Sequence, residues 1–334
     1  LKNTKTEINS SNDIKELPEI GQKTIDKLDE LINTSKVGEL EKLKEKHGTD
    51  KYEEYKEKEK IKEILMQIHG IGSAKADQLI DLNIKTIEEL EKRKQEKVPN
   101  KGKTKKQLDL LTSAQLKGLE YYHQLLERIP RSEIDEYKTL LSKYFIEALN
   151  ELDEDPKNNN FEIVGSYRRG KSDSGDIDII MTSTKNNKAI YFKFLEKLDK
   201  ANIIKAFLTK GDIKSFAIAK LSDDHTARRL DFLYSPPEEY AFSILYFTGS
   251  KDFNTAMRQH ALTKNLTLNE HGFHKILNKK KGEKVLNTKF ESEKDIFDYL
   301  NMEYKEPNNR IDKTSIILKQ EQEQEQEQEQ EQEQ

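Results

Sequence analysis

The sequence contains no cysteine. This excludes disulfides, thiolate zinc sites and cysteine nucleophiles, so any bound metal must use oxygen or imidazole ligands. No apolar run in the sequence approaches the length of roughly 20 residues that a helix needs to span a bilayer. No secretory signal is present at its start. We therefore expect an intracellular protein with no membrane segment. Because the first residue is Leu1 rather than Met, we also expect a fragment without its natural start.

Charged residues are plentiful, at 36% of the 334 residues, yet the formal net charge of −4 hides a basic body. The last fourteen residues are seven Glu-Gln pairs, and without their seven acids 58 basic residues face 55 acidic ones. Positive charge gathers in residues 92–106 and 279–284, as in proteins that bind phosphate. Such runs are more often solvated surface, so charge alone does not decide the function.

The hydrophobic pattern changes along the chain. Residues 13–145 carry apolar stripes at helical spacing that are broken at glycines, which predicts an all-helical region. From Phe161 onward, β-rich runs such as DIDIIMTS and RRLDFLY alternate with helical stretches, which predicts a mixed sheet. The Glu-Gln tail has no residues that could form a core, so we expect it to be disordered. The expected fold class is α+β with several domains.

A short motif occurs twice in the helical region, as LPEIG at residues 17–21 and IHGIG at residues 68–72, each followed by an amphipathic helix. The pattern is typical of a helix-hairpin-helix, in which backbone N–H groups and a helix N-terminus hold a DNA phosphate whatever the base sequence. Gly21 and Gly72 would let the backbone approach that phosphate closely. The alternative is a glycine cap between two ordinary core helices, which one copy alone would not exclude.

The stretch GSYRRGKSDSGDID at residues 165–178 is the most specific in the chain. Asp176 and Asp178 are two residues apart, so on a strand their carboxylates face the same side. Asp231 lies amid apolar neighbours in RRLDFLY and would be costly to bury unless a metal or partner neutralised it. The three acids predict a site for two Mg²⁺ ions, with Mn²⁺ as the alternative, that catalyses phosphoryl transfer. Taken alone, such a pair of acids is more often a solvated edge or a calcium-loop fragment.

The turn before these acids has the chemistry of a phosphate-binding loop. Ser166 offers a hydroxyl, Arg169 offers a charged fork of N–H donors, and the glycines expose backbone N–H groups. A phosphate cradle directly beside a set of acids favours catalysis over a solvated edge.

GSYRRG, SGDIDI, RRLDF, YFTGS and FNTAMRQHA occur in this order, and together they resemble the palm and fingers of the family X DNA polymerases, the family of DNA polymerase beta. The resemblance runs from about Ile14 to Arg310, and only the tail and the lysine-rich insertion lie outside it. It implies a helix-hairpin-helix module followed by a palm and a fingers-like subdomain. The implied regions are a partial lyase domain with the first hairpin (1–48), a helical DNA-binding subdomain with the second hairpin (49–145), a nucleotidyltransferase palm (146–240), a nucleotide-selecting C-terminal subdomain (241–312) and a disordered tail (313–334).

The resemblance assigns roles around the nucleotide phosphates. It makes Asp176, Asp178 and Asp231 the ligands of the divalent metals. The residues that it implies on the triphosphate are Arg128, Ser166, Arg169 and Gly175.

It also assigns roles around the sugar and base of the nucleotide. The YFTGS turn, with Tyr246, Phe247 and Gly249, is expected under the sugar, where the two rings disfavour a ribose 2′-hydroxyl by sterics. Asn254 and Arg258 are expected at the minor-groove edge of the new base pair. Without the resemblance, Tyr246 and Phe247 would be assigned a packing role.

A second activity follows from the same resemblance. Lys27 matches the amine that forms a Schiff base with an abasic sugar in a 5′-deoxyribose-phosphate lyase. Lys23, one helical turn earlier, would bind phosphate and lower the pKa of that amine. By sequence alone Lys27 is an ordinary surface lysine. In the family, further helices that carry lyase-site residues precede this lysine. The sequence that begins at Leu1 does not contain them, so we expect weak lyase activity.

The two hairpins are expected to bind DNA and a monovalent cation, K⁺ or Na⁺. The expected DNA contacts are Gly21, Lys23, Gly70, Gly72 and Lys75. The backbone carbonyls expected on the cations are those of Lys15, Leu17 and Ile20 in the first hairpin and Met66, Ile68 and Ile71 in the second. Glu19 stands where the family usually has glycine, which weakens the expectation for the first copy.

Several positions depart from the family pattern. Leu233 stands where an arginine commonly pairs with the catalytic acids in the open state, so we expect a different open-to-closed switch. Lys251, Thr255 and His271 replace an acid, a lysine and a tyrosine near the nascent pair and primer terminus. No metal ligand is lost.

The sequence therefore predicts a monomeric DNA-directed DNA polymerase that fills short gaps in base excision repair. Its expected partners are gapped or nicked DNA, dNTPs and other repair proteins. The repair role and the basic tracts favour the nucleus, with the mitochondrion as the alternative if a targeting signal precedes Leu1. Two other functions stay open: template-independent nucleotide addition by the same palm, and a noncatalytic DNA-binding scaffold that uses only the hairpins.

Overall fold

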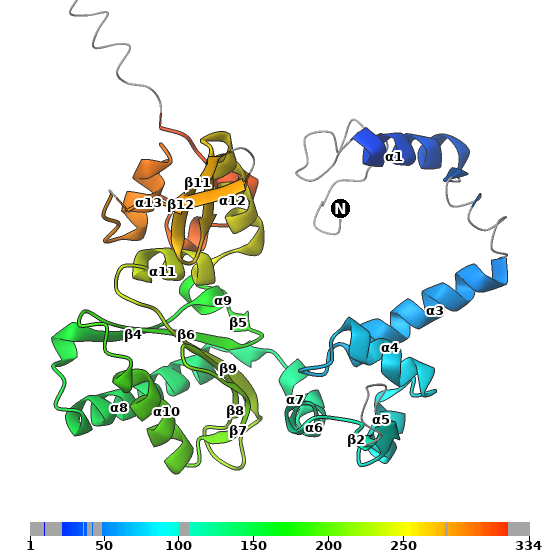
Figure 1. Ribbon diagram of the computed structural model, residues 1–334, viewed down its shortest axis with the longest axis horizontal. Helices are drawn as coiled ribbons and strands as arrows, with labels where there is room; N and C mark the ends of the chain where they lie inside the picture. Colours follow the sequence, from blue (N-terminus) through cyan, green and yellow to red (C-terminus); the bar gives the residue numbers. More distant parts are fainter. Residues whose placement is uncertain are drawn as a thin grey trace, which may run out of the picture. The chain divides into compact units, whose positions relative to one another are not determined.

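The computed structural model describes residues 22–35, 49–99, 107–277, 280–286 and 288–319, together with positions 10, 37, 38 and 42. The Glu-Gln tail and the LPEIG hairpin lie outside these residues. The chain divides into two compact units, Leu1–Leu119 and Glu120–Gln334, which are described separately (Figure 1). In the described part of the chain, no helix is long and apolar enough to cross a membrane.

The first unit consists mainly of helices that each bury few residues. They are α1 (Gln22–Thr34), α3 (Thr49–Leu65), α4 (Ser73–Asp81), α5 (Ile87–Arg93) and α6 (Ser113–Glu120). The end of α3 and the turn after it bury Leu65, Ile68 and Ile71. A capping box formed by Thr86 and Glu89 starts α5, because each side chain satisfies a backbone N–H that the first helical turn leaves without a partner.

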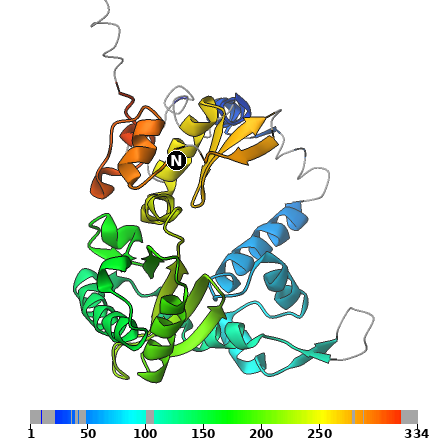
Figure 2. The same ribbon diagram turned by 60° about the vertical axis from the view of Figure 1, so that its left-hand side comes forward.

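A two-stranded hairpin interrupts these helices. Strands β1 (Lys97–Pro99) and β2 (Gln107–Asp109) pair antiparallel, and Figure 2 shows them extending from the helices. The prediction that residues 13–145 are all helical is therefore wrong here. Each strand has three residues, which is too short to produce a recognisable alternation of apolar and polar positions.

The second unit contains a five-stranded sheet in the order β4-β6-β9-β8-β7. Strands β6 and β9 run parallel and the other neighbours run antiparallel, which confirms the predicted mixed sheet. Their bounds are β4 (Asn159–Ile163), β6 (Ile177–Ser183), β7 (Ile204–Lys210), β8 (Lys214–Ala219) and β9 (Arg228–Tyr234).

Two long helices, α8 (Arg131–Glu151) and α10 (Ala189–Lys200), cover one face of this sheet (Figure 1). Their apolar residues recur every three or four positions and form one core with inward-facing strand residues such as Ile177, Ile179 and Phe232. The boundary expected at 145/146 falls inside α8, whereas the contacts divide the chain after Leu119. The helix belongs with the sheet because its buried residues, among them Leu141 and Phe145, share one core with α10 and the strands.

The opposite face of the sheet is covered in two places. Helix α11 (Tyr240–Thr248) packs through Ile244 against Val164 and Ile180. Helix α7 (Tyr122–Leu126) lies near Leu208 and Ile218. Because side chains alternate along a strand, the acids Asp178 and Asp231 also point to this face, between the two covered areas.

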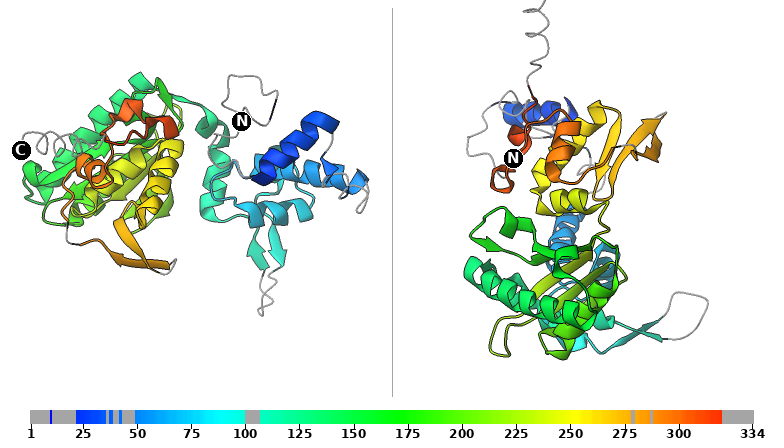
Figure 3. Two further views of the ribbon diagram at one scale, coloured as in Figure 1. Left: turned by 90° about the horizontal axis from the view of Figure 1, so that it is seen from above. Right: turned by 90° about the vertical axis from the view of Figure 1, so that its left-hand side faces the viewer.

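The C-terminal part of the second unit has its own apolar core. It contains α12 (Lys251–Thr263), α13 (Glu293–Tyr299) and an antiparallel sheet of β10 (Leu266–Asn269), β11 (Gly272–Leu277) and β12 (Lys280–Lys284). Figure 3 shows β11 and β12 extending beyond these helices. The unit also contains the short pair of β3 (Ile129–Pro130) with β5 (Asp173–Ser174) and the single-turn helix α9 (Gly165–Arg168).

Candidate active site

The structure brings the three predicted acids together. Asp178 and Asp231 are register partners on the parallel strands β6 and β9, and Asp176 immediately precedes β6. One carboxylate oxygen from each acid lies within 4.8 Å of the other two. Three carboxylates and no nitrogen or sulfur donor form the ligand set that Mg²⁺ and Mn²⁺ prefer.

The electrostatics of the three acids show that their charges are poorly compensated. Burial raises the pKa of Asp178 to about 7, and the neighbouring charges of Asp176 and Asp231 add to the effect. Burial likewise raises the pKa of Asp231 to about 6, although Arg229 opposes the rise. Like charges held together at low solvent exposure disfavour ionisation, so a cation at this place would be bound favourably.

Arg229 is the cation that the sequence analysis missed. It lies two residues before Asp231 on β9 and therefore on the same face; its Nε donates to Asp231 Oδ1 at 3.0 Å, and its Nη2 donates to Asp176 Oδ2. The family pattern predicts an arginine at position 233, where this chain has leucine. Leu233 instead lines a cavity of about 50 Å³ with Lys214 and Phe247 beside the acids. The alternation of RRLDF already placed Arg229 beside Asp231.

The turn before β6 requires glycine at its first position. Gly165 has a φ of +61°, and a Cβ there would lie 2.4 Å from Oδ2 of Asp178. Any side chain would therefore both strain the backbone and collide with Asp178. The following Ser166 donates a hydrogen bond from its hydroxyl to that of Ser174 at 2.7 Å. The predicted phosphate loop thus lies directly against the acids.

The two arginines of this loop have different surroundings. Arg169 is half-buried, and its Nη1 donates to the carbonyl oxygen of Thr248 at the end of α11. Burial lowers the pKa of Arg169, and Asp178 opposes the change. Arg168 instead pairs with Glu293 of α13 and with Glu162. Arg169 alone of the two lies beside the acids.

The remaining predicted phosphate contacts lie at the edge of the same loop. A Cβ at Gly175 would lie 3.0 Å from Nη1 of Arg128, so the guanidinium lies over this glycine.

Gly249, in the turn predicted under the sugar, has a φ of +68°, and its peptide bond to Ser250 is cis. A Cβ at Gly249 would lie 3.2 Å from Nη1 of Arg169.

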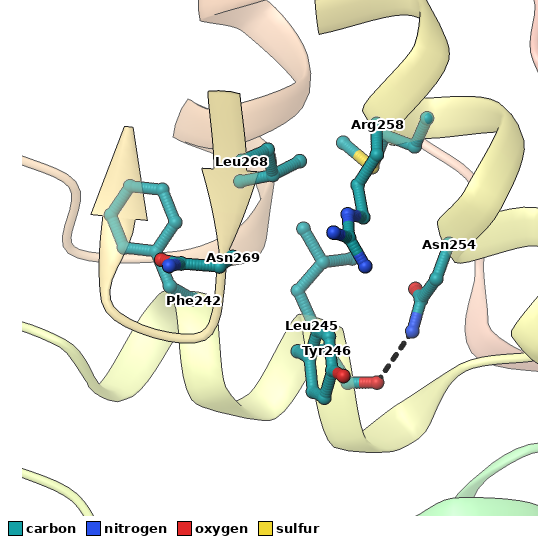
Figure 4. Close-up of a pocket in the computed structure, with 8 residues that line it drawn as sticks. Phe242, Leu245, Tyr246, Asn254, Arg258, Leu268 and Asn269 are labelled. Atoms are coloured by element: carbon teal, nitrogen blue, oxygen red, sulfur yellow. Dashed lines mark hydrogen bonds between the residues drawn. The ribbon is translucent and has the colours of Figure 1, made fainter. Parts of the chain in front are cut away.

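The predicted sugar and base contacts fall into two groups. Tyr246, Asn254 and Arg258 line one pocket between α11 and α12. Figure 4 shows Asn254 and Arg258 pointing from α12 toward α11, where the Asn254 amide donates to the carbonyl oxygen of Tyr246 at 2.6 Å. Phe247, whose ring lies 5.1 Å from that of Tyr246, instead lines the cavity beside Asp178 and Asp231.

The second hairpin of the first unit is a tight turn. Gly70 has a φ of +83°, and the carbonyl of Ile68 accepts from the N–H of Ile71 at 3.1 Å. Gly72 is the N-cap of α4 and no side chain caps it, so the N–H groups of the first helical turn are left to other partners. Met66 is 44% exposed at the start of the turn.

Helix α6 packs against this hairpin. The Gln115 amide donates to the carbonyl oxygen of Gly70 at 2.7 Å. A Cβ at Gly118 would lie 2.7 Å from the carbonyl oxygen of His69, so α6 lies close against the hairpin backbone. The ammonium of Lys75 donates to Gln78 at 3.1 Å and to the carbonyl of Leu110. Lys75 would have to leave these partners to reach a phosphate.

Lys23 and Lys27 lie four residues apart on α1, and both are exposed. The only buried residue of this helix is Ile25. The other predicted residues of the first hairpin lie outside the described residues: Lys15, Leu17, Ile20 and Gly21.

Comparisons with known proteins match three consecutive family models. Residues 63–126 match the fingers domain of DNA polymerase lambda, residues 128–237 the DNA polymerase beta palm, and residues 243–311 the DNA polymerase beta thumb. The C-terminal subdomain is therefore a thumb, and the prediction that it is fingers-like is wrong. The sequence motifs are shared by the whole family and carried no information on which subdomain bears which name.

Three curated relatives match across most of the chain. DNA polymerase lambda from Arabidopsis thaliana is 28% identical over 91% of the chain, and that from Rattus norvegicus is 27% identical over 93%. A DNA nucleotidylexotransferase from Gallus gallus is 24% identical over 93%. The chain spans 55%, 50% and 61% of the lengths of these relatives, respectively.

Proposed function

We propose that this chain, which belongs to the family X DNA polymerases, adds deoxynucleotides to a primer 3′ end under the direction of a template and so fills short gaps in DNA. The observation that carries the proposal is the cluster of Asp176, Asp178 and Asp231 on two parallel strands next to a glycine turn. The substrates are gapped or nicked DNA and dNTPs, and the biological setting is base excision repair.

The three acids would hold two divalent ions, Mg²⁺ or Mn²⁺. Bound there, these ions would lower the pKa of the attacking 3′-hydroxyl and neutralise charge on the triphosphate. The chain's own part is to keep the carboxylates on one face of the sheet. Arg229 offsets part of their negative charge through its hydrogen bonds to Asp231 and Asp176.

The nucleotide would lie between the phosphate loop and α11. Arg128, Ser166, Arg169 and the N–H of Gly175 would bind its phosphates. Tyr246 and Phe247 would contact its sugar, with Gly249 forming the turn that brings them there. Asn254 and Arg258, which both point toward α11, would contact the minor-groove edge of the new base pair.

We propose that the second hairpin binds the DNA backbone without regard to sequence. The support is the positive φ of Gly70 and the N-cap position of Gly72, which leave backbone N–H groups accessible to a phosphate. The carbonyls of Met66, Ile68 and Ile71 would bind K⁺ or Na⁺. The first hairpin would act in the same way through Gly21 and Lys23.

A lyase activity through Lys27 is the second part of the proposal. Its support is the position of Lys27 four residues after Lys23 on one helix. Borohydride should trap a covalent adduct between the protein and DNA with a 5′-deoxyribose phosphate, and Lys27→Ala should lose the adduct while extending primers normally. An undiminished adduct in Lys27→Ala would show that another amine reacts.

Template-independent addition is the alternative function. It is favoured by the similarity to a relative named as a DNA nucleotidylexotransferase and by Leu233, Lys251, Thr255 and His271, which depart from the family pattern around the nascent pair. The same acids would serve both reactions, so the site itself does not separate them.

Gap filling tests the proposed function. A one-nucleotide gap with a 5′-phosphate would be offered with Mg²⁺ and each dNTP singly, beside a single-stranded primer without template. Addition of only the complementary nucleotide, and none without template, is the expected result. Indiscriminate addition would favour the transferase, and no addition would favour a DNA-binding scaffold.

The setting of the protein follows from the proposed reaction. A gap-filling polymerase that acts on chromosomal DNA would work in the nucleus as a monomer, alongside proteins that create and seal the gap.

A further inference from the structure

The arginine nearest the edge of the phosphate loop is paired with an acid that the proposed reaction leaves without a role. Arg128 precedes β3 and Asp173 begins β5, and the two strands pair with Ile129 opposite Ser174. The N–H of Arg131 also donates to the carbonyl oxygen of Ser172 at 3.0 Å. This ladder pairs Pro130 with Asp173 and leads Arg128 toward Gly175, so the Arg128 side chain reaches Asp173 diagonally across the two strands.

The acid binds one edge of the guanidinium. Oδ1 of Asp173 accepts from Nε of Arg128 at 2.8 Å and from Nη2 at 2.5 Å, and the Asp173 carbonyl accepts from Nη2 at 3.3 Å. Nη1 makes no hydrogen bond within the described residues. It lies over Gly175, at 3.0 Å from the place of an added Cβ, next to the metal-binding Asp176.

We propose that Asp173 is a positioning residue for the triphosphate of the incoming nucleotide: by accepting from Nε and Nη2 it holds Arg128 with Nη1 directed at the phosphates. The inference rests on the proposed function, because it needs a nucleoside triphosphate at the phosphate loop. Arg128 touches the substrate, and Asp173 acts through Arg128.

The physical reason is preorganisation. The side chain of Arg128 is 61% exposed and that of Asp173 44%, so without the acid the long arginine side chain would sample many rotamers. A phosphate would then have to order it on binding, which weakens binding. Asp173 orders it beforehand and leaves Nη1, which has two N–H donors, for the ligand.

The negative charge of Asp173 opposes this benefit, since it also lies near the phosphates. The two effects can be separated by substitution. Asp173→Asn would keep an oxygen that accepts from Nε but lose the charge, whereas Asp173→Ala would lose both. A positioning role predicts that the asparagine variant is mild and the alanine variant is harmful, while charge repulsion predicts that both variants bind nucleotide more tightly.

The experiment is steady-state filling of a one-nucleotide gap by the full chain, with KM for the complementary dNTP and kcat measured separately. Asp173→Ala should raise KM between about 1.5-fold and five-fold with kcat unchanged, the effect of an exposed ion pair worth about 0.2–1 kcal/mol. Asp173→Asn should stay closer to the wild type. In an Arg128→Ala background, Asp173→Ala should change KM no further.

Asp223→Ala is the control, because the exposed Asp223 forms an ion pair with Lys205 at 2.7 Å outside the described site. Its KM should equal that of the wild type. An unchanged or lower KM in Asp173→Ala would overturn the inference, as would an equal effect of Asp173→Ala with and without Arg128. An inactive wild type would instead count against the proposed function itself.

Discussion

Two clusters of arginine and acid in the second unit show opposite balances of charge. At the candidate active site, Arg229 pairs with both Asp231 and Asp176, while Asp178 adds a third acid. Between the sheet and α13, Glu293 is bound by two arginines, to Arg168 Nη2 at 2.7 Å and to Arg310 Nη1 at 2.6 Å.

The pKa values of the acids in the two clusters reflect how many arginines each cluster contains. Burial raises the pKa of Asp178 and Asp231. Burial alone would also raise the pKa of Glu293, but hydrogen bonds from Arg168 and Arg310 outweigh it and lower that pKa. A cluster whose charges are satisfied by the chain stabilises the fold, whereas a cluster left with excess negative charge is suited to bind cations from solution.

The largest effect is expected at the active site. Asp231→Ala should lower the rate of primer extension by about 10³-fold or more, because one ligand of the proposed metal ions is lost. Binding to gapped DNA, measured by fluorescence anisotropy, should stay within about twofold of the wild type, since the hairpins and not the acids are proposed to hold the DNA backbone. Asp224→Ala, which changes an exposed acid outside the site, should extend like the wild type. Normal extension by Asp231→Ala would refute the metal assignment.

The second largest effect is expected in the satisfied cluster. Glu293→Gln leaves Arg168 and the fully buried Arg310 without their shared carboxylate, and breaking a buried ion pair costs about 3–5 kcal/mol. Urea unfolding should show this loss. Glu291→Gln, which removes only an exposed pair with Lys289, should cost less than about 1 kcal/mol. Equal stability of the two variants would show that the buried cluster does not hold the thumb and palm together.

The two clusters should also change the free energy of unfolding in opposite directions as the pH rises in metal-free buffer. Asp178, with a pKa of about 7, and Asp231, with a pKa of about 6, bind protons more tightly when folded, so their contribution to stability falls as the pH rises through the window from about 4 to 7. The contribution of Glu293 is present above its ordinary pKa of 4.5 and is lost as the pH falls.

Unfolding between about pH 5 and about pH 8 with EDTA measures this difference. Asp178→Asn should reduce the loss of stability toward the alkaline end, and Glu293→Gln should leave that slope unchanged. An identical slope in the wild type and Asp178→Asn would mean that the acids are not strained by their neighbours.

The smallest effect concerns Arg229. Arg229→Gln removes the guanidinium that is hydrogen-bonded to Asp176 and Asp231, and the metal-free protein should lose about 1–2 kcal/mol, since that guanidinium is about a third exposed. Mn²⁺ should restore most of the loss, because it replaces the missing charge. Arg93→Gln, which breaks an exposed pair with Glu96, should show no recovery with Mn²⁺.

The sequence predicted the acids and the mixed sheet because both follow from alternation along strands. The spacing of Asp176 and Asp178 fixes their shared face, and the apolar neighbours of Asp231 place it on a buried strand. The same alternation places Arg229 on the face of Asp231, whereas the family pattern points to position 233, which is leucine here. The β1–β2 hairpin was missed because strands of three residues carry no period.

Other features depend on contacts between residues far apart in the sequence. Glu293 meets Arg168 across 125 positions, and Arg128 meets Asp173 across 45. No local pattern indicates such pairs. The packing of α8 against the sheet could not be predicted from the sequence either, because the apolar pattern of an amphipathic helix does not indicate which surface it covers.

Binding of Mn²⁺ tests the central claim most directly, namely that the excess negative charge of the three acids is a cation site. The electron paramagnetic resonance signal of free Mn²⁺ would be followed at about pH 8, above the raised pKa values of the acids, on addition of protein with dideoxy-terminated gapped DNA and the complementary dNTP. The wild type and Asp224→Ala should remove more Mn²⁺ from solution than Asp178→Asn and Asp231→Ala. Equal removal by all four proteins would contradict the account.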